Sequence, residues 1–369
     1  MEENRLTYEG SGVDYERIDP LKILAQRSAR STGSNLEKSG VSEVVASRGE
    51  SAYVVDIGDA YFASITECLG TKSLVADVVR GFTERTWYDN IAQDTIAAAV
   101  NDIVTVGATP LTIHAYWATG SSDWFDDTDR MNDLVSGWKI ACDNLEVAWG
   151  GGETPCLTGI VENDAIDLAA SCVGIIRPKS RLTLGEGLAA GDAIILLESS
   201  GIHANGLTLA RRLAERLPEG YATVMTDGRI YGEALLDPTI LYPPVIEAIF
   251  DAGISLQYIV NITGHGWRKI MRHPEELTYR ITKLPPVPTV LEFIVDETKE
   301  TPEEAYSSLN MGAGFALFVR SADADKVVAC AEASGVRAWV SGIVEDGPRQ
   351  VVIEPLDVTL TGESLTLRG

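Results

Sequence analysis

The feature that most constrains this 369-residue chain is a loop, Ser199–Gly206, that lies between a strand-like and a helix-like segment. The run 192–198 is short and apolar, as a buried strand would be. The run 207–217 carries leucines at helical spacing, which predicts a helix. Backbone N–H groups at such a junction, beside serine and asparagine, can bind an anion such as phosphate. The alternative is an ordinary strand-to-helix turn capped by Asn205.

Three further loops in the chain are punctuated by glycine. The first, 66–72, follows a hairpin-like pair of apolar runs at 53–65. The second, 149–154, reads Trp-Gly-Gly-Gly-Glu-Thr, and the third, 262–267, reads Ile-Thr-Gly-His-Gly-Trp and opens a short basic helix at 268–272. One such loop is weak evidence, but four with acidic, basic and imidazole side chains indicate a phosphate-rich ligand.

Charge and cysteine content limit the partners and the compartment. The formal net charge is −24, which argues against nucleic acid or an anionic membrane as a partner because both are polyanions. The five cysteines form no Cys-x-x-Cys pair, which is typical of a reducing compartment. The first residues are polar, and no apolar run approaches the roughly 20 residues of a membrane span. We therefore expect a soluble cytoplasmic protein.

The length predicts two domains or one large one. We expect residues 1–45, which are polar, to form a mobile arm or lid, residues 46–177 an N-terminal domain, and residues 178–369 a C-terminal domain. The predicted helices are 90–104, 127–141, 207–217, 243–250, 303–309 and 322–334. The predicted strands are 53–57, 61–65, 111–118, 145–149, 165–176, 192–198, 257–262, 314–319 and 338–344.

Taken in order, the loops resemble one family, phosphoribosylformylglycinamidine cyclo-ligase, also called aminoimidazole ribonucleotide synthetase. The resemblance covers most of the chain. It is carried by Tyr8–Asp14, Asp94, Asn101-Asp102, Val106–Leu111, Tyr116–Gly120, Gly151–Thr154, Cys172–Gly174, Ser199–Gly206, Pro238-Thr239, Thr263–Trp267 and Asn310–Gly314. It implies a two-domain fold of the α+β or α/β class, with a β-sheet in the N-terminal domain that pairs with that of a second subunit. The C-terminal domain would be α+β with a mixed sheet, and the protein a homodimer.

The chain also departs from the family pattern. Where the family usually carries Asp-Gly-Val-Gly-Thr-Lys, this chain has Glu67-Cys68-Leu69-Gly70-Thr71-Lys72. Because Cys68 replaces a glycine, a left-handed backbone there would be strained. Pro155-Cys156-Leu157-Thr158 stands where the family has an Ala-Glu-Met-Pro-like segment. His265 stands where the family mostly has glycine, and Ala204 where it mostly has serine. These departures are compatible with nucleotide binding and leave the substrate open.

The resemblance implies ATP and Mg²⁺ as cofactors, which need oxygen ligands for the metal and cationic or N–H groups for the phosphates. If 90–104 is helical, Asp94 and Asn101 share one face; the alternative is that Asp94 decorates a solvated helix. The expected metal ligands are Glu67, Asp94 and Asp102. The residues expected to bind ATP or substrate are Gly70, Thr71, Lys72, Asp94, Asn101, Gly151, Gly152, Ser200, Gly201, Asn205, Gly264 and His265. The expected catalytic residues are Lys72, His203 and Glu153.

The implied reaction is an ATP-dependent ring closure of formylglycinamidine ribonucleotide, a small-molecule substrate. Such a reaction needs positioning and charge stabilisation more than a strong nucleophile. One alternative is an ATP-dependent enzyme of the same superfamily that acts on selenide, thiamine phosphate or a carbamoyl carrier. Another is a nucleotide-binding paralogue without activity, which the Glu67-Cys68-Leu69 departure would permit.

Overall fold

The computed structural model describes residue 6 and residues 15–364, so the Tyr8–Asp14 stretch of the family resemblance lies outside the described residues. The helices are α1 Tyr15–Arg30, α2 Lys72–Thr83, α3 Tyr88–Ile103, α4 Thr128–Asn144, α5 Leu207–Ala214, α6 Tyr231–Leu235, α7 Pro243–Asp251, α8 Thr289–Thr298, α9 Pro302–Ser308 and α10 Ala324–Ala333. The strands are β1 Ser42–Glu43, β2 Tyr53–Asp56, β3 Tyr61–Cys68, β4 Thr109–Thr119, β5 Ala148–Glu153, β6 Ile166–Ile176, β7 Asp192–Glu198, β8 Leu256–Asn261, β9 Leu277–Ile281, β10 Ala313–Arg320, β11 Ala338–Asp346, β12 Gln350–Ile353 and β13 Val358–Thr361.

The first half of the chain folds around a six-stranded mixed sheet with the order β1-β2-β3-β6-β4-β5. The predicted hairpin is confirmed as β2 and β3, which pair antiparallel, whereas β4 and β5 pair parallel. Along β6, fully buried residues alternate with exposed or half-buried ones, as in a sheet covered more completely on one face. Helix α3 packs on β3 and β6 and against α4. The alternation of strands and helices predicted for this half is therefore confirmed, except that α2 was not predicted and that β5 begins at Ala148 rather than at 145.

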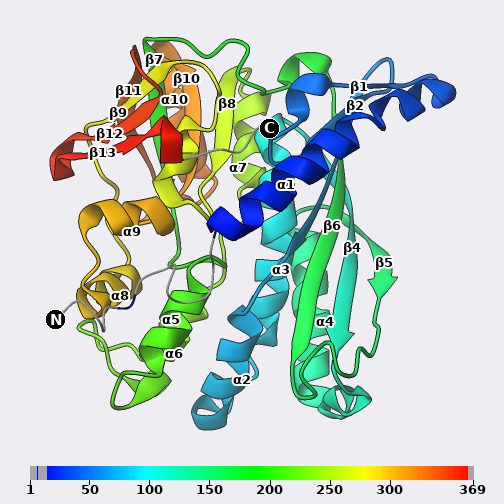
Figure 1. Cartoon of the computed structure of the whole chain (residues 1–369), viewed down its shortest axis with the longest axis vertical. Helices are drawn as coiled ribbons and strands as arrows, with labels where there is room; N and C mark the ends of the chain where they lie inside the picture. Colours follow the sequence, from blue (N-terminus) through cyan, green and yellow to red (C-terminus); the bar gives the residue numbers. More distant parts are fainter. Residues whose placement is uncertain (1–5, 7–14, 365–369) are drawn as a thin grey trace.

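The second half contains a seven-stranded mixed sheet with the order β13-β12-β9-β11-β7-β10-β8. Its neighbours pair antiparallel except β12 and β9, which run parallel. Strands β7 and β10 are buried along nearly their whole length, which explains why both are continuous apolar runs rather than alternating ones. Helix α10 packs on β7 and β11 and against α7. The fold is thus mixed α+β with two sheets, and the halves lie side by side in Figure 1.

Helix α3 lies between the two halves and is buried at 12 of its 16 residues. One stripe of its polar side chains bonds the segment 236–242 of the second half. Asn90 Nδ2 donates to Leu236 O (2.9 Å), and Asn101 Nδ2 donates to Ile240 O (2.8 Å). Asn101 Oδ1 also accepts from the backbone N–H of Tyr242 (3.0 Å). This stripe joins the two halves through backbone groups that would otherwise be buried without partners.

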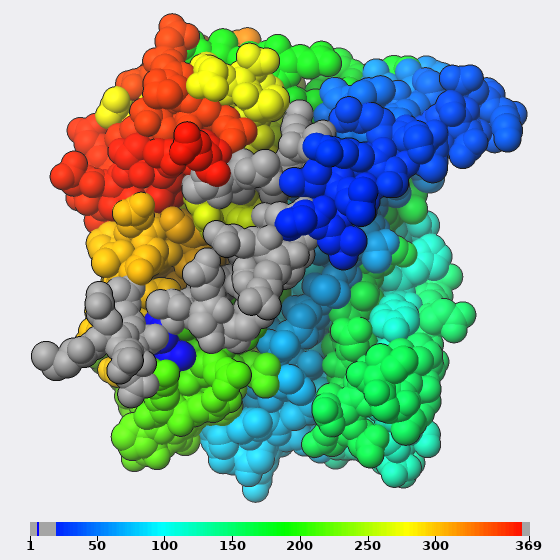
Figure 2. Space-filling model, in the orientation of Figure 1, coloured from blue at the N-terminus to red at the C-terminus, as the bar shows by residue number. Residues whose placement is uncertain are grey.

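The described part of the predicted arm is mostly helical. It comprises α1, the 3₁₀ helix Gly33–Ser39 and the short strand β1. Leu21 and Leu24 of α1 are exposed, and Figure 2 shows this N-terminal segment on the molecular surface beside the first sheet. Leu6, in contrast, is 9% exposed and packs with the buried core, so the interpretation of residues 1–45 as a mobile arm outside the core stays a prediction.

The helices are short for membrane insertion. Across the part of the chain that the structure describes, no helix is both long enough and apolar enough to cross a bilayer. The longest helix among the described residues, α4, has 17 residues with charged side chains along its length.

Candidate active site

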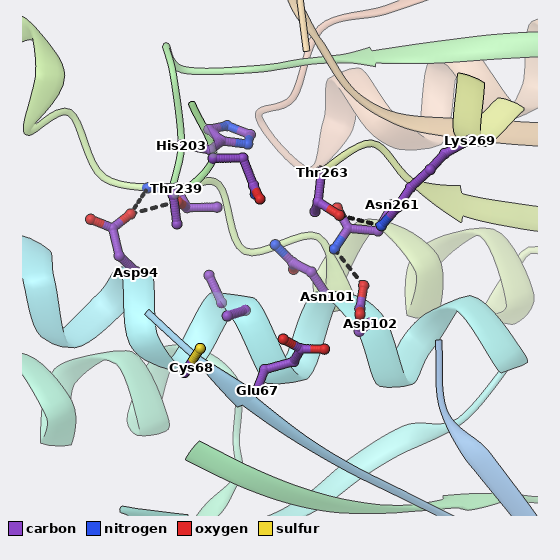
Figure 3. A pocket seen from close by; sticks show the side chains of 14 residues that line it. Glu67, Cys68, Asp94, Asn101, Asp102, His203, Thr239, Asn261, Thr263 and Lys269 are labelled. Atoms are coloured by element: carbon purple, nitrogen blue, oxygen red, sulfur yellow. Dashed lines mark hydrogen bonds between the residues drawn. The ribbon is translucent and has the colours of Figure 1, made fainter. Parts of the chain in front are cut away.

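A cavity of about 120 Å³ opens where the two halves meet at α3. Its walls come from the end of β3, from α3, from the loop after β7, from the segment before α7 and from the end of β8 with the helical turn that follows (Figure 3). The lining residues are Glu67, Cys68, Asp94, Ala97, Ala98, Asn101, Asp102, His203, Ala204, Asn205, Thr239, Asn261, Thr263 and Lys269. Ala97 and Ala98 leave the α3 wall uncrowded. The cavity therefore brings together five segments from different parts of the sequence.

Asp94 is fully buried, and both of its carboxylate oxygens have partners. Oδ2 forms an ion pair of 2.7 Å with Lys72 Nζ, and Oδ1 accepts hydrogen bonds from the backbone N–H and the hydroxyl of Thr239. Lys72, the first residue of α2, is also fully buried, and its ammonium donates to Asp237 O (2.8 Å). Burial raises the pKa of Asp94, although the Lys72 ammonium opposes this shift. The expected metal ligand and the expected phosphate-binding lysine are thus bound to each other.

Asn101 and Asp102 follow Asp94 along α3 and make different contacts. Asn101 bonds the second half through Ile240 and Tyr242 and also lines the cavity. Asp102 is buried, and its Oδ1 accepts from Asn261 Nδ2 at 2.7 Å (Figure 3). Asp102 therefore presents a carboxylate at the cavity wall, held in place by an amide from β8.

Glu67 points into the cavity from β3, on the side facing α3 (Figure 3). Burial, and secondarily the negative charge of Asp102, raise the pKa of Glu67 to about 7. The neighbouring Cys68 also lines the cavity, and it pairs with Ala169 in extended strand geometry. The strain that a left-handed Cys68 would carry does not arise. The Asp102 carboxylate thus lies close enough to Glu67 to raise the pKa of the Glu67 carboxyl.

Lys269 enters the cavity from the other side. It belongs to the 3₁₀ helix Gly266–Met271, which the sequence predicted as a short basic helix, and it is 9% exposed. Its ammonium donates to the hydroxyl of Thr263, another lining residue (Figure 3). Burial lowers the pKa of Lys269 to about 8, although Asp102 and Glu67 oppose this shift.

The loop Ser199–Gly206 forms the upper wall in Figure 3, with His203, Ala204 and Asn205 on the cavity. His203 Nε2 accepts from the backbone N–H of Ser200 at 3.1 Å, and burial lowers the pKa of His203 to about 3. The ring is therefore neutral at pH 7. Asn205 does not cap α5, because its Oδ1 accepts from the N–H of Gly264 (3.1 Å). Two of the predicted glycine loops are thus bonded to each other.

Other predicted residues lie near the cavity without lining it. Gly70 and Thr71 form the turn between β3 and α2, where Gly70 has a φ of 77°. Ser200 donates its hydroxyl to Pro238 O at 2.6 Å, and Gly201 follows it in the loop. His265 is buried beside Thr263, and its pKa is lowered to about 3, chiefly by burial. Their assignments to ATP or substrate remain predictions.

The predicted glycine loop 149–154 lies elsewhere. Gly151, Gly152 and Glu153 belong to β5, the edge strand of the first sheet, where every residue is exposed. Figure 1 shows β5 at the edge of that sheet that lies away from α3 and the second half. Within this one chain the structure does not bring Glu153 to the cavity, and its predicted catalytic role remains untested.

The sequence interpretation missed several lining residues. They are Cys68, Ala98, Ala204, Thr239, Asn261, Thr263 and Lys269. Thr239 and Thr263 lay inside stretches already noted for the family, so their hydroxyls could have been proposed. Lys269 carried no usable signal, since a lysine in a short basic helix is usually solvated.

The donor set suits a cation held jointly by the protein and a phosphorylated ligand. Nowhere among residues 6 and 15–364 do three or more His, Cys, Asp or Glu side chains form a group that could hold a metal by themselves. Mg²⁺, however, is commonly bound through one or two carboxylates and completed by water and phosphate oxygens. Glu67 and Asp102 meet that requirement, whereas Asp94 would first have to release Lys72.

Comparison with known proteins gives two kinds of match. The profile of the family described as "AIR synthase related protein, N-terminal domain" matches residues 49–176. A phosphoribosylformylglycinamidine cyclo-ligase of Methanothermobacter thermautotrophicus is 33% identical over 98% of this chain and 100% of its own length. One from Carboxydothermus hydrogenoformans is 32% identical over 96% of this chain and 99% of its own.

Solved structures share the fold at low sequence identity. The HypE–HypF complex contains a chain with a TM-score of 0.60 and 16% identity, covering 85% of this chain and 92% of that one. AaThiL complexed with AMPPCP and TMP matches with a TM-score of 0.54 and 15% identity, covering 84% and 89%. T. maritima PurL complexed with AMPPCP matches with a TM-score of 0.55 and 13% identity, covering 86% of this chain and 46% of that one.

Proposed function

The chain belongs to the phosphoribosylformylglycinamidine cyclo-ligase family, and we propose that it closes the imidazole ring of aminoimidazole ribonucleotide at the expense of ATP, a step of purine biosynthesis. The observation that carries this proposal is the similarity to curated cyclo-ligases over nearly the full length of both chains. The cavity supports it, because carboxylates, a lysine and a neutral histidine line a single space.

The chemistry has two steps. The formamide oxygen of formylglycinamidine ribonucleotide attacks the γ-phosphorus of ATP, and the bond from that phosphorus to the bridging oxygen breaks, so that ADP leaves with the electron pair. The neighbouring amidine nitrogen then attacks the activated formyl carbon, the carbon–oxygen bond breaks, and inorganic phosphate leaves. The nitrogen loses its proton as the ring closes. Both steps require alignment of the reacting atoms and stabilisation of phosphoryl charge.

We assign Mg²⁺ to Glu67 and Asp102, which share the cavity. When bound, the ion would supply positive charge to the phosphate oxygens of ATP. The Ser199–Gly206 loop, with Gly264 bonded to Asn205, is the proposed cradle for phosphate. His203, neutral at pH 7 because its pKa is lowered, can donate or accept a hydrogen bond but brings no charge.

We also propose that two copies of the chain associate through the first sheet and that the protein works in the cytoplasm. Phe62 of β3 is 39% exposed and lies directly opposite Ile175 of β6, with Val173 on the same face. The opposite face of the sheet packs on α3. Partly exposed apolar side chains in register on one face are typical of a surface that another copy covers.

The test is an incubation of the purified protein with ATP, Mg²⁺ and formylglycinamidine ribonucleotide. We expect ADP, phosphate and aminoimidazole ribonucleotide to appear in equal amounts, and no ADP above background when the ribonucleotide is omitted. A Glu67→Gln variant should lose most of the product. Rapid ADP formation that is indifferent to the ribonucleotide would assign the protein to another reaction of the superfamily, and absence of turnover with retained ATP binding would indicate a non-catalytic paralogue.

A further inference from the structure

Lys269 is the one lysine or arginine side chain among the described residues that line the cavity. It is placed there by the 3₁₀ helix Gly266–Met271, which begins after His265, a residue with a φ of 69°. The whole residue is only 9% exposed, so its ammonium faces the cavity rather than bulk water. Such a position is unusual for a lysine, since lysines are rarely buried without a partner of opposite charge.

The ammonium of Lys269 has few protein partners. It has three N–H donors, and Thr263 Oγ1 is its one hydrogen-bond acceptor among the residues that the structure describes. No carboxylate oxygen in that part of the chain lies within 4 Å of Nζ. The lowered pKa of Lys269 reflects this desolvation. A buried cation of this kind costs free energy in the free protein, and an anion entering the cavity would offset that cost.

Lys72 provides the contrast. Its ammonium is held by Asp94 and by Asp237 O, and its side chain is fully buried and does not line the cavity. It can meet a ligand only by giving up its ion pair. Lys269 needs no such rearrangement, and it lies within electrostatic range of both Glu67 and Asp102, the two proposed metal ligands.

We propose that Lys269 is a catalytic residue that contacts the phosphoryl group as it passes from ATP to the formamide oxygen, the role that sequence reasoning assigned to Lys72. This inference rests on the proposed function for the identity of the phosphoryl acceptor. The placement of Lys269 does not depend on that identity: the Lys269 ammonium would contact the terminal phosphate of the nucleotide, across the cavity from Glu67 and Asp102, the proposed metal ligands.

The test compares Lys269→Met, Lys269→Arg and the control Lys139→Met, which removes a lysine that is 70% exposed on α4. For Lys269→Met we expect kcat to fall about 100-fold, the usual scale for one lost electrostatic contact to a transition state, with a smaller change in KM. Lys269→Arg, which keeps the charge, should recover part of the rate. Lys139→Met should behave as the wild type.

Two readouts that need no turnover complete the experiment. Calorimetry with Mg²⁺ and AMPPCP, a non-hydrolysable ATP analogue, should show at least tenfold weaker binding to Lys269→Met. Thermal unfolding of the ligand-free Lys269→Met variant should give an unchanged or higher melting temperature, because a cation without a carboxylate partner has been removed. A merely structural lysine would instead lower the melting temperature.

The outcomes separate the two proposals. If the wild type forms no aminoimidazole ribonucleotide but Lys269→Met binds the analogue weakly, the substrate assignment fails and Lys269 remains a phosphate contact. If the wild type is active and Lys269→Met matches it in both kcat and analogue binding, the role of Lys269 is refuted. A lower melting temperature with unchanged analogue binding refutes it as well.

Discussion

The buried pair of Lys72 and Asp94 leads to a quantitative prediction about stability. Both side chains are fully buried, the ion-pair distance is 2.7 Å, and Asp94 also accepts two hydrogen bonds from Thr239. Replacing Asp94 with asparagine keeps the shape and one acceptor but leaves the Lys72 ammonium buried without a counter-ion. Breaking a buried pair in this way costs about 3–5 kcal/mol of unfolding free energy. That is a large share of the roughly 5–15 kcal/mol by which proteins are stable.

The assay is urea unfolding followed by circular dichroism for Asp94→Asn, Lys72→Met and the double variant. Each single change should cost about 3–5 kcal/mol, and the double variant should cost clearly less than the sum, because it removes both charges together. The exposed pair of Lys139 and Asp143 is the control, and Lys139→Met should change stability by less than about 0.5 kcal/mol. A Lys72→Met variant as stable as the wild type, or strictly additive effects, would show that the ion pair does not stabilise the fold and that Lys72 is available to a ligand.

Three further predictions concern pH, metal and assembly. His203 has a pKa of about 3 in the folded protein and about 6.5 when unfolded, so its contribution to stability is present above pH 6.5 and is lost as the pH falls toward 3. Between pH 6.5 and 5 the wild type should therefore lose roughly 1.5 kcal/mol more unfolding free energy than His203→Asn, and parallel pH profiles in urea titrations would contradict this. Asp102→Asn should weaken Mg²⁺-dependent ATP binding by at least tenfold in calorimetry while leaving binding without Mg²⁺ nearly unchanged, and equal losses in both conditions would exclude a metal ligand. Light scattering at micromolar concentration should give about twice the 39.7 kDa chain mass, and Phe62→Asp should shift the protein toward the monomer, whereas a monomeric wild type that binds ATP would refute the sheet pairing.

The sequence predicted elements best where one physical signal dominated. The continuous apolar run of β7 gave its bounds as 192–198, and the buried periodicity of α3 placed that helix within two residues at each end. Helix α2 was missed because it begins inside a glycine loop that was interpreted only for phosphate binding. Helix α1 was missed because it is largely exposed and carries little apolar periodicity.

The site was predicted less completely, because side-chain direction depends on tertiary contacts. Glu67, Asp102 and His203 were expected at the site, and all three line the cavity. Lys72 was expected to face the ligand, yet a lysine beside a glycine turn can equally point toward an aspartate on the next helix. Lys269 was overlooked for the opposite reason, because only the packing of the turn after β8 shows that this basic residue points inward. Sequence spacing cannot distinguish these two lysines.

The polar side chains of α3 that bond residues 236–242 have a consequence for how the site can be lost through gene rearrangement and how it can be inhibited. The carboxylates come from the first half of the chain and the histidine and lysine from the second, while the stripe that bonds residues 236–242 keeps the two walls in register. Neither half alone contains the complete set of cavity residues. Gene rearrangements that separate the halves would therefore abolish the site. A compound that binds between α3 and residues 236–242 would separate the two walls and inhibit the enzyme without resembling either substrate.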